Sequence, residues 1–193
     1  GISHHIGLHR LPPVLREFTR RYPAVQLDID FMDSELAHQR ILQGEMDLAV
    51  ITLSPSQEEN LSFIPVWEDS LTVAVSNDHP LADARQVSIA MLSQHIAIPP
   101  GLNTYTGQII KQLFDDAGLE MEIGMSTNYL ETIKVMVSIG LGWSILPHTL
   151  LDSSVTALSL EGVDLHRTLG CVHHRKRSLS NAAEAFIDLL PSP

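Results

Sequence analysis

The sequence predicts an α/β fold made of two successive sets of strands and helices. Its length, 193 residues, is enough for one large α/β unit or for two lobes of roughly 100 residues each. Segments with helical and strand-like hydrophobic periods alternate along the chain, and this alternation occurs twice. The run LAVITL at 48–53 contains almost no polar residue, which indicates a strand buried on both faces, as parallel sheets require.

The first set of elements opens with an amphipathic helix. Apolar residues recur every three or four positions over 8–22 and predict one helix of about 15 residues, which Pro23 ends. Residues 25–31 alternate between apolar and polar side chains and predict a strand with one exposed face. The elements expected next are a short helix behind Asp33 and Ser34 closed by Gly44, the strand at 48–53 that completes a βαβ crossover, and short strands at 63–67 and 71–75.

The second set repeats the order of strand, loop and helix. A strand at 96–98 leads through the loop 99–103 into a helix that starts near Thr104 and ends at Gly118. The remaining expected elements are a strand at 121–125, a helix introduced by a capping-box-like pair of Asn128 and Glu131, an apolar strand at 143–146 between Gly142 and Pro147, strands near 155–160 and 165–172, and a last helix at 179–190.

Composition excludes several classes of protein. A content of 44% hydrophobic residues, without a glycine period or lasting heptads, excludes collagen, coiled coils and disordered chains. A single cysteine excludes a disulfide scaffold and leaves Cys171 as a small buried hydrophobe or as a partner for another chain. No apolar run reaches the length of a membrane span, and no signal peptide is recognisable, so we expect a soluble chain. The net charge of −11 argues against this segment binding a phosphate backbone by itself.

Signatures of catalysis and of metal binding are weak. The segment from Gly140 to Leu146 has neither the third glycine of a dinucleotide loop nor a nucleophile elbow, and no phosphate loop or HExxH motif occurs. Asp115 and Asp116 fall on the polar face of a predicted helix. Ten histidines raise the question of a metal, because His5 and His9 could share a helix face. A structural zinc needs four convergent ligands, so we expect no metal, although a histidine cluster could make ligand capture depend on pH.

Polar residues stand at four predicted helix starts that follow a strand or extended segment. Hydroxyl and amide groups there lie beside unpaired backbone N–H groups at the positive end of a helix, which suits a carboxylate, sulfate or phosphate. Each alone could be an ordinary helix cap. Several at the carboxyl ends of parallel strands would face one crevice, where open α/β sheets bind ligands. The four starts are Ser3 with His4 and His5, Asp33 with Ser34, Asn103 with Thr104, and 126–128.

Five segments together resemble the effector-binding domain of LysR-type transcriptional regulators. They are GISHHIGLHRLP at 1–12, FTRRYP at 18–23, QGEMDLAV at 43–50, NDHPL at 77–81 and the glycine-containing VMVSIGLGWSILP at 135–147. The resemblance covers essentially the whole chain in the family's order. It implies a type 2 periplasmic-binding-protein fold, in which two Rossmann-like α/β lobes are joined by two crossover strands and a small effector binds in the cleft.

The resemblance also implies boundaries, partners and site residues. Lobe I would be residues 1–72 with 171–193, and lobe II residues 73–170; a winged helix-turn-helix absent from this chain would precede Gly1. The implied protein is cytoplasmic, pairs as a homodimer or as a tetramer when full length, reaches promoter DNA only through the missing domain, contacts no membrane and needs no cofactor or metal. The positions that match the family's ligand-lining residues are Ser3, His4, His5, Ser34, Thr52, Pro100, Gly101, Asn103, Thr104 and Asn128.

Thr52 departs from relatives that recognise aromatic acids, which can have an arginine at the end of the third strand. The leading hypothesis is a ligand-sensing domain of a bacterial transcription factor that binds a small, anionic metabolite. The alternative is a free periplasmic solute-binding protein of the same fold, which a secretion signal in the complete gene would favour. An enzyme is the least favoured hypothesis, because resemblance in fold supplies no chemistry.

Overall fold

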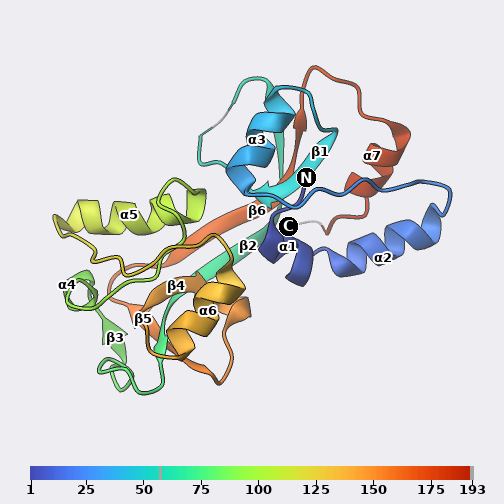
Figure 1. Ribbon diagram of the computed structural model, residues 1–193. Helices are drawn as coiled ribbons and strands as arrows, with labels where there is room; N and C mark the ends of the chain where they lie inside the picture. The colour runs from blue at the N-terminus through green and yellow to red at the C-terminus, as the bar shows by residue number, and fades with distance from the viewer. Residues whose placement is uncertain (57, 192–193) are drawn as a thin grey trace. The chain divides into compact units, whose positions relative to one another are not determined.

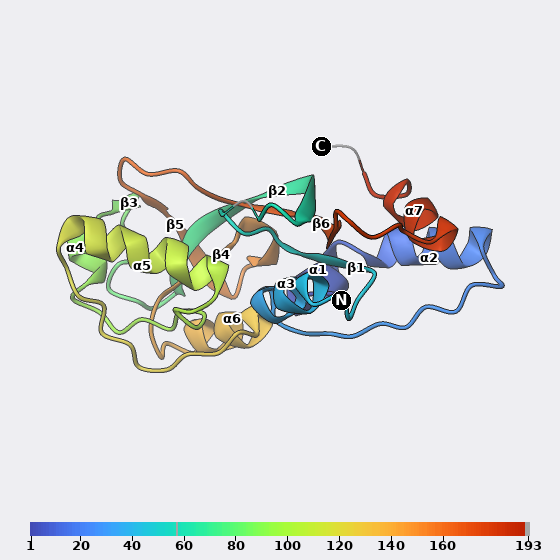
Figure 2. The same ribbon diagram turned by 90° about the horizontal axis from the view of Figure 1, so that it is seen from above.

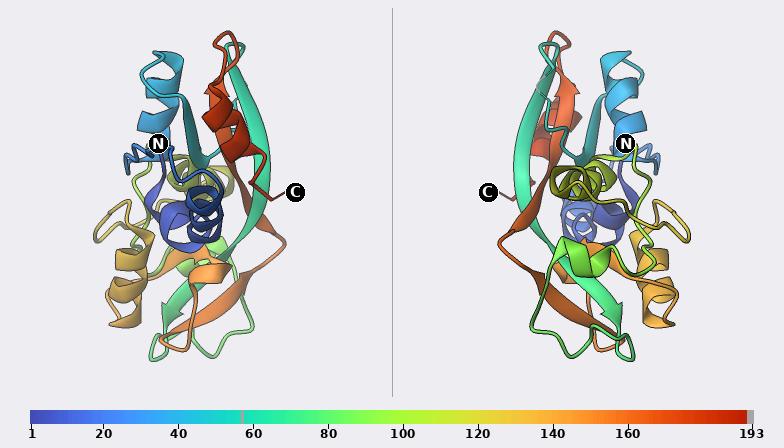
Figure 3. Two further views of the ribbon diagram at one scale, coloured as in Figure 1. Left: turned by 90° about the vertical axis from the view of Figure 1, so that its right-hand side faces the viewer. Right: turned by 90° about the vertical axis from the view of Figure 1, so that its left-hand side faces the viewer.

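The computed structural model describes residues 1–56 and 58–191 and is mixed α and β, as predicted (Figure 1). The described residues divide into two compact units. Unit 1 holds Gly1–Glu68 and the chain from Thr168 onward, and unit 2 holds Asp69–Arg167. Strands β2 (Leu61–Ser76) and β6 (Leu165–His174) each have residues in both units, so the chain passes between the units along two long strands (Figure 3). The predicted boundaries, after residues 72 and 170, fall on the same two strands.

Unit 1 is organised around β1 (Leu48–Thr52), whose last four residues are buried. One edge of β1 pairs antiparallel with β6, from Leu48 opposite His173 to Thr52 opposite Leu169. The other edge pairs with the first residues of the chain, because Val50 N–H donates to Gly1 O at 2.8 Å. The helices of unit 1 are α1 (His4–His9), α2 (Pro12–Arg21), α3 (Ser34–Leu42) and α7 (Asn181–Ile187).

Two layers of helix cover this sheet. Helices α2 and α7 lie side by side (Figure 2), and the rings of Phe18 and Phe186 meet edge to face at 5.5 Å between centroids. Helix α3 packs Ala37 and Ile41 into a second cluster with Ile51 of β1. Burial of these apolar side chains supplies most of the driving force for the unit.

Two predictions for unit 1 are wrong. The single helix over 8–22 is instead α1 and α2, because Pro12 and Pro13 lack the N–H that a helix interior requires and favour a helix start. Residues 25–31 are not a strand, apart from one parallel bridge between Phe31 and Ile2. The short helix behind Asp33 and the buried strand at 48–53 are confirmed as α3 and β1.

Unit 2 combines antiparallel and parallel pairing. Strand β2 pairs antiparallel with β4 (Ser144–Pro147) and with β5 (Val155–Leu160), and β5 pairs in parallel with β3 (Gln86–Val87). The strand predicted as two pieces, 63–67 and 71–75, is the continuous β2. The strands predicted at 96–98 and 121–125 reduce to isolated parallel bridges of Ala97 with Ile123 and Trp143. The other elements are α4 (Ile89–Leu92), which was not predicted, α5 (Tyr105–Ala117), α6 (Leu130–Ser138) and the 3₁₀ turn η1 (His148–Leu150).

Trp143 belongs to the larger core cluster of unit 2. Its ring is 1% exposed and stacks on Phe114 at 5.8 Å between centroids. Its indole N–H lies 3.0 Å from both Leu92 O and His95 O, so the polar atom is satisfied inside the core. This contact fixes α4 and the turn after it against the strand segment that leads into β4.

Among the described residues, no helix is long and apolar enough to cross a bilayer.

Candidate functional site

In unit 1, Ser34 and Thr52 are brought together at the end of β1. Thr52 N–H donates to Ser34 Oγ at 3.1 Å, and both residues are buried. Two residues earlier on the same edge of β1, the hydrogen-bond partner is the beginning of the chain: Ser3 N–H donates to Val50 O at 3.2 Å. After Ser3 the chain enters α1 and no longer runs beside β1. The next N–H group on this edge of β1, that of Thr52, therefore donates to the Ser34 hydroxyl. Ser34 therefore joins the start of α3 to the end of the strand.

Ser3, His4 and His5 form the start of α1, next to the same strand end. Ser3 is the N-cap residue, and its side chain makes no capping hydrogen bond. The ring of His4 lies 5.4 Å from that of Phe31, and the buried ring of His5 lies 4.8 Å from that of His9. The predicted pairing of His5 and His9 on one helix face is confirmed, and it supplies half of the four ligands that a structural zinc requires.

In unit 2, side chains take part in three hydrogen bonds that hold the loop before α5. Gly101 N–H donates to Asn128 Oδ1 at 3.0 Å, and the Thr104 hydroxyl donates to Gly101 O at 2.7 Å. Gly107 N–H donates to Thr104 Oγ1 at 3.0 Å, so Thr104 is the side-chain N-cap of α5, as predicted. The loop lies close against the first turn of the helix: a Cβ on Gly107 would come within 2.0 Å of Gly101 O.

The other predicted residues of unit 2 differ in their surroundings. Pro100 is buried and Asn103 is exposed. Asn128 does not cap α6, contrary to the predicted capping box; Tyr129 is the N-cap residue, without a side-chain capping bond. Asn128 is one position too early for the cap, and its side-chain oxygen accepts from the loop instead.

Sequence reasoning missed a buried charged group behind this loop. Arg167 donates from Nε and Nη2 to Asp69 Oδ2 at 2.9 and 2.7 Å, and from Nη1 to Thr106 Oγ1 at 3.0 Å. All three residues are buried, and Thr106 belongs to the first turn of α5. The sequence did indicate such a group, because Arg167 interrupts a predicted apolar strand. An arginine buried in a strand needs a charged or hydrogen-bonding partner.

The polar residues at the end of β1 and those of the loop before α5 act through hydrogen bonds. Ser34 and Thr104 use their hydroxyls on backbone groups, an arrangement that does not activate a nucleophile. The guanidinium near the start of α5 is neutralised by Asp69. Asp115 is paired with Lys111 on the exposed face of α5, which confirms the solvated face predicted for it.

Burial raises the pKa of the Cys171 thiol to about 12, so this cysteine is a small core residue in unit 1.

Comparisons with known proteins agree with these observations. The family model described as LysR substrate binding domain matches residues 1–192. The HTH-type transcriptional regulator CysL of Bacillus subtilis (strain 168) is 25% identical over 195 residues, an alignment that covers 98% of this chain. The chain spans less than two thirds of that regulator's length, 65%.

Solved structures give the same result for the fold. The effector-binding domain of QuiR in complex with shikimate has a TM-score of 0.86 at 21% identity, and the regulatory domain of CcmR from Synechocystis PCC6803 in complex with 2-PG has 0.86 at 24% identity. In both comparisons 98% of this chain and 92% of the other are covered. The fold is therefore that of these effector-binding domains, and with a family match over residues 1–192 the chain belongs to the LysR substrate-binding domain family.

Proposed function

We propose that the chain is the effector-sensing domain of a bacterial LysR-type transcriptional regulator, acting in the cytoplasm through a DNA-binding domain elsewhere in the longer protein. The observation that carries this proposal is the family match over residues 1–192. The family consists of regulators rather than enzymes, and the match favours this function over a free periplasmic solute-binding protein. The two structurally similar domains, QuiR and CcmR, hold shikimate and 2-PG, which supports a small molecule as the effector.

The effector we propose carries an anionic group bound without a salt bridge. In unit 1 the binding groups would be Ser3, Ser34 and Thr52, and in unit 2 the loop from Gly101 to Thr104 with Asn128. None of these is a lysine or arginine. The start of α5 offers N–H groups at the positive end of a helix of 13 residues, which favours negative charge. The remaining predicted residues, His4, His5 and Pro100, would line the site.

Calorimetry with a panel of small metabolites tests this assignment. The parent would be compared with Ser34→Ala and Thr104→Ala, and with Thr104→Ser as the control that keeps the hydroxyl. A hydrogen bond to a charged ligand contributes about 1.5–3 kcal/mol, so Ser34→Ala should bind roughly tenfold more weakly or worse. The Thr104 hydroxyl donates to Gly101 O and caps α5, so Thr104→Ala should weaken binding by releasing the loop that holds the ligand. A ligand that binds the parent and both alanine variants equally well would show that these hydroxyls are not part of the site.

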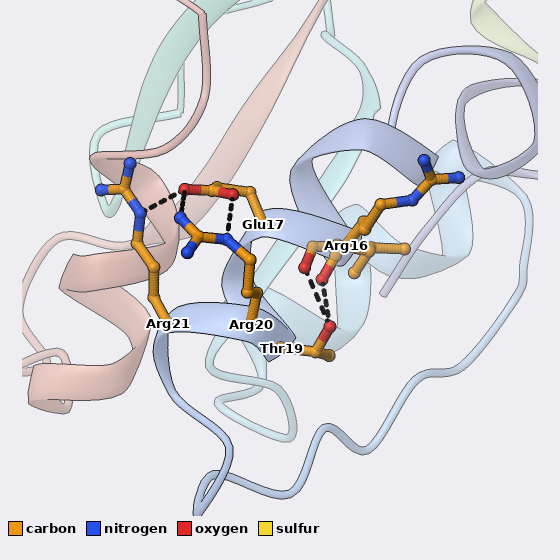
Figure 4. A network of polar contacts seen from close by, with 6 residues as sticks. Arg16, Glu17, Thr19, Arg20 and Arg21 are labelled. Atoms are coloured by element: carbon orange, nitrogen blue, oxygen red, sulfur yellow. Dashed lines mark hydrogen bonds and ion pairs between the residues drawn. The ribbon is translucent and has the colours of Figure 1, made fainter.

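We also propose that the domain forms a two-fold homodimer, in which α2 of one protomer contacts α5 of its partner. Both helices have an apolar face in their own unit and an exposed polar face. On α2 that face carries Arg20 and Arg21 around Glu17 (Figure 4), and on α5 it carries Gln112 bonded to Asp116 at 2.6 Å. A two-fold axis would bury the same two patches on both protomers.

Analytical sedimentation of charge-reversal variants tests the dimer. Arg21→Glu or Gln112→Glu should weaken association, whereas Arg85→Glu, an exposed residue outside both helices, should leave it unchanged. A parent that sediments as a monomer at high concentration would exclude the proposed contact.

A further inference from the structure

Two pairs of histidine rings are in contact in the described part of the chain. His5 and His9 of α1 lie 4.8 Å apart between ring centroids, and so do His79 and His95 of unit 2. Imidazole nitrogen is a common ligand of copper, nickel and zinc ions. A pair of rings chelates such an ion only when each ring can direct a nitrogen lone pair at the same point.

The pair in α1 meets this requirement. His5 and His9 are four residues apart, so their side chains leave one face of the helix one turn apart. A nitrogen of one ring lies within 4.8 Å of a nitrogen of the other. Metal–nitrogen bonds of about 2.0–2.1 Å place two ligand nitrogens about 3.0–3.4 Å apart, a difference that rotation of the exposed His9 side chain can close. Two histidines at this spacing on a helix are also the zinc ligands of the HExxH motif.

The surroundings of this pair hold the ligands in place before an ion arrives. Ile6, the residue after His5, is 1% exposed and packs in the core cluster with Phe18 and Val50. This packing stabilises α1, which has six residues and would be marginal alone. His5 is buried and His9 is exposed, so packing immobilises one ligand and the other leaves the ion accessible to water. The entropy lost when the ion binds is correspondingly small.

The pair in unit 2 does not meet the requirement. Leu81 N–H donates to His79 Nδ1 at 3.1 Å, so the neutral ring carries its own proton on Nε2. An ion on Nδ1 would displace this hydrogen bond. An ion on Nε2 would require the proton to move to Nδ1, which breaks the same bond. His79 and His95 therefore have the ring separation of the α1 pair without its capacity to chelate, and they provide an internal comparison.

Two imidazoles also define the class of ion. Zinc in a structural role needs four protein ligands, which this pair does not supply. Copper(II) accepts tetragonal nitrogen and oxygen ligands and heads the affinity order of the divalent series, whereas magnesium and calcium select oxygen ligands. We propose that His5 and His9 form a labile site for a divalent transition-metal ion, copper ahead of nickel and zinc, with water or a small anion in the remaining positions.

This site uses neither Ser34 nor Thr52 as a ligand, and it does not depend on the proposed effector function. Its position bears on the effector nevertheless, because His5 is among the residues proposed to line the effector site. A cation bound there favours an anionic ligand, since a metal ion is often the largest local charge in a site.

Calorimetric titration with metal chlorides tests the site, using the chain prepared without a polyhistidine tag. We expect one copper(II) ion per chain, weaker binding of nickel(II) and zinc(II), and no binding of magnesium at the same concentrations. An outer-shell partner of a metal ligand contributes roughly 10–100-fold to affinity, so His9→Gln, which removes a ligand itself, should weaken copper binding at least tenfold. His95→Gln, from the pair in unit 2, is the matched control and should leave copper binding unchanged.

Electron paramagnetic resonance of the copper-loaded chain identifies the ligands without relying on affinity. Hyperfine coupling to two imidazole nitrogens in the parent should fall to one in His9→Gln. His9 is exposed, so this variant should keep the fold, which far-ultraviolet circular dichroism checks. Unchanged copper affinity in His9→Gln, a single imidazole in the parent spectrum, or an equal loss in His95→Gln would overturn the proposal. Every titration uses the metal alone, so these outcomes leave the effector-sensing function untouched.

Discussion

Arg167, Asp69 and Thr106 show how a single buried contact can hold the framework of a binding loop. The guanidinium bonds to a carboxylate on β2 and to a hydroxyl in the first turn of α5, the helix that begins at the Thr104 cap. The polar Asp69 does not interrupt β2, because its charge is matched within the structure. The pair therefore permits one long strand where the hydrophobic pattern predicts two short ones.

Removing one member of this pair should be far more costly than removing both. Asp69→Ala leaves a buried guanidinium without its partner, and we expect unfolding in urea to show a loss of about 3–5 kcal/mol. The double variant Asp69→Leu with Arg167→Met should recover most of that loss. Lys134→Met, which breaks the exposed pair with Asp152, is the control and should change stability little. If the double variant is no more stable than Asp69→Ala alone, the two residues do not act as a pair.

Helix α2 illustrates how one element combines a buried and a charged face. Val14 and Phe18 are buried, while Glu17 accepts hydrogen bonds from Arg20 and Arg21 on the exposed side (Figure 4). The bonds from Arg20 and then Arg21 lower the pKa of Glu17 to about 2. These bonds therefore contribute fully to the stability of the folded state above the carboxyl's ordinary pKa of 4.5, and their contribution is lost as the pH falls toward 2.

Carboxyl titration by NMR checks this prediction for α2. The Glu17 midpoint should lie near 2 in the parent and rise toward the ordinary value when Arg20 and Arg21 are both replaced by Gln. Replacing Arg16 by Gln, the neighbouring arginine that makes no ion pair with Glu17 in Figure 4, should leave the midpoint in place. A parent midpoint near 4.5 would mean that the bonds are not maintained in solution.

For the whole molecule, the net charge bears on whether the chain can bind DNA by itself. With 23 acidic against 12 basic residues, its net charge of −11 opposes the counterion release that drives DNA binding. We expect this chain to show no appreciable affinity for promoter DNA at physiological salt, and the longer protein to bind it. Fluorescence anisotropy over a salt series measures this directly. Tight, salt-sensitive binding by the chain alone would contradict the division of roles proposed here.

Much of the fold could be predicted because periodicity and caps are local properties. Thr104 and Gly118 bound α5 as predicted, with Gly118 in the left-handed conformation at φ 64°. The failures have different causes. The break at Pro12 is a local signal, but the apolar stripe that continues across it favours one helix in the prediction. The strand predicted over 25–31 is not formed beyond the bridge of Phe31 with Ile2, because strand formation depends on pairing with another segment, which the pattern of 25–31 alone does not report. Of the candidate site, the hydroxyls were found from their place at helix starts, whereas Arg167 was missed because its partners lie far away in the sequence.

The buried indole of Trp143 allows unit 2 to be followed by intrinsic tryptophan fluorescence. The chain has two tryptophans: Trp143 is enclosed and doubly hydrogen-bonded in unit 2, and Trp67 packs, partly buried, in unit 1. Emission from an enclosed indole is blue-shifted and resists quenching by iodide, whereas a partly exposed one emits further to the red and is quenched. Replacing either tryptophan by phenylalanine leaves a single emitter in a known unit. The protein thus carries an intrinsic optical reporter for each unit, with which effector titrations and unfolding can be followed separately without any attached dye.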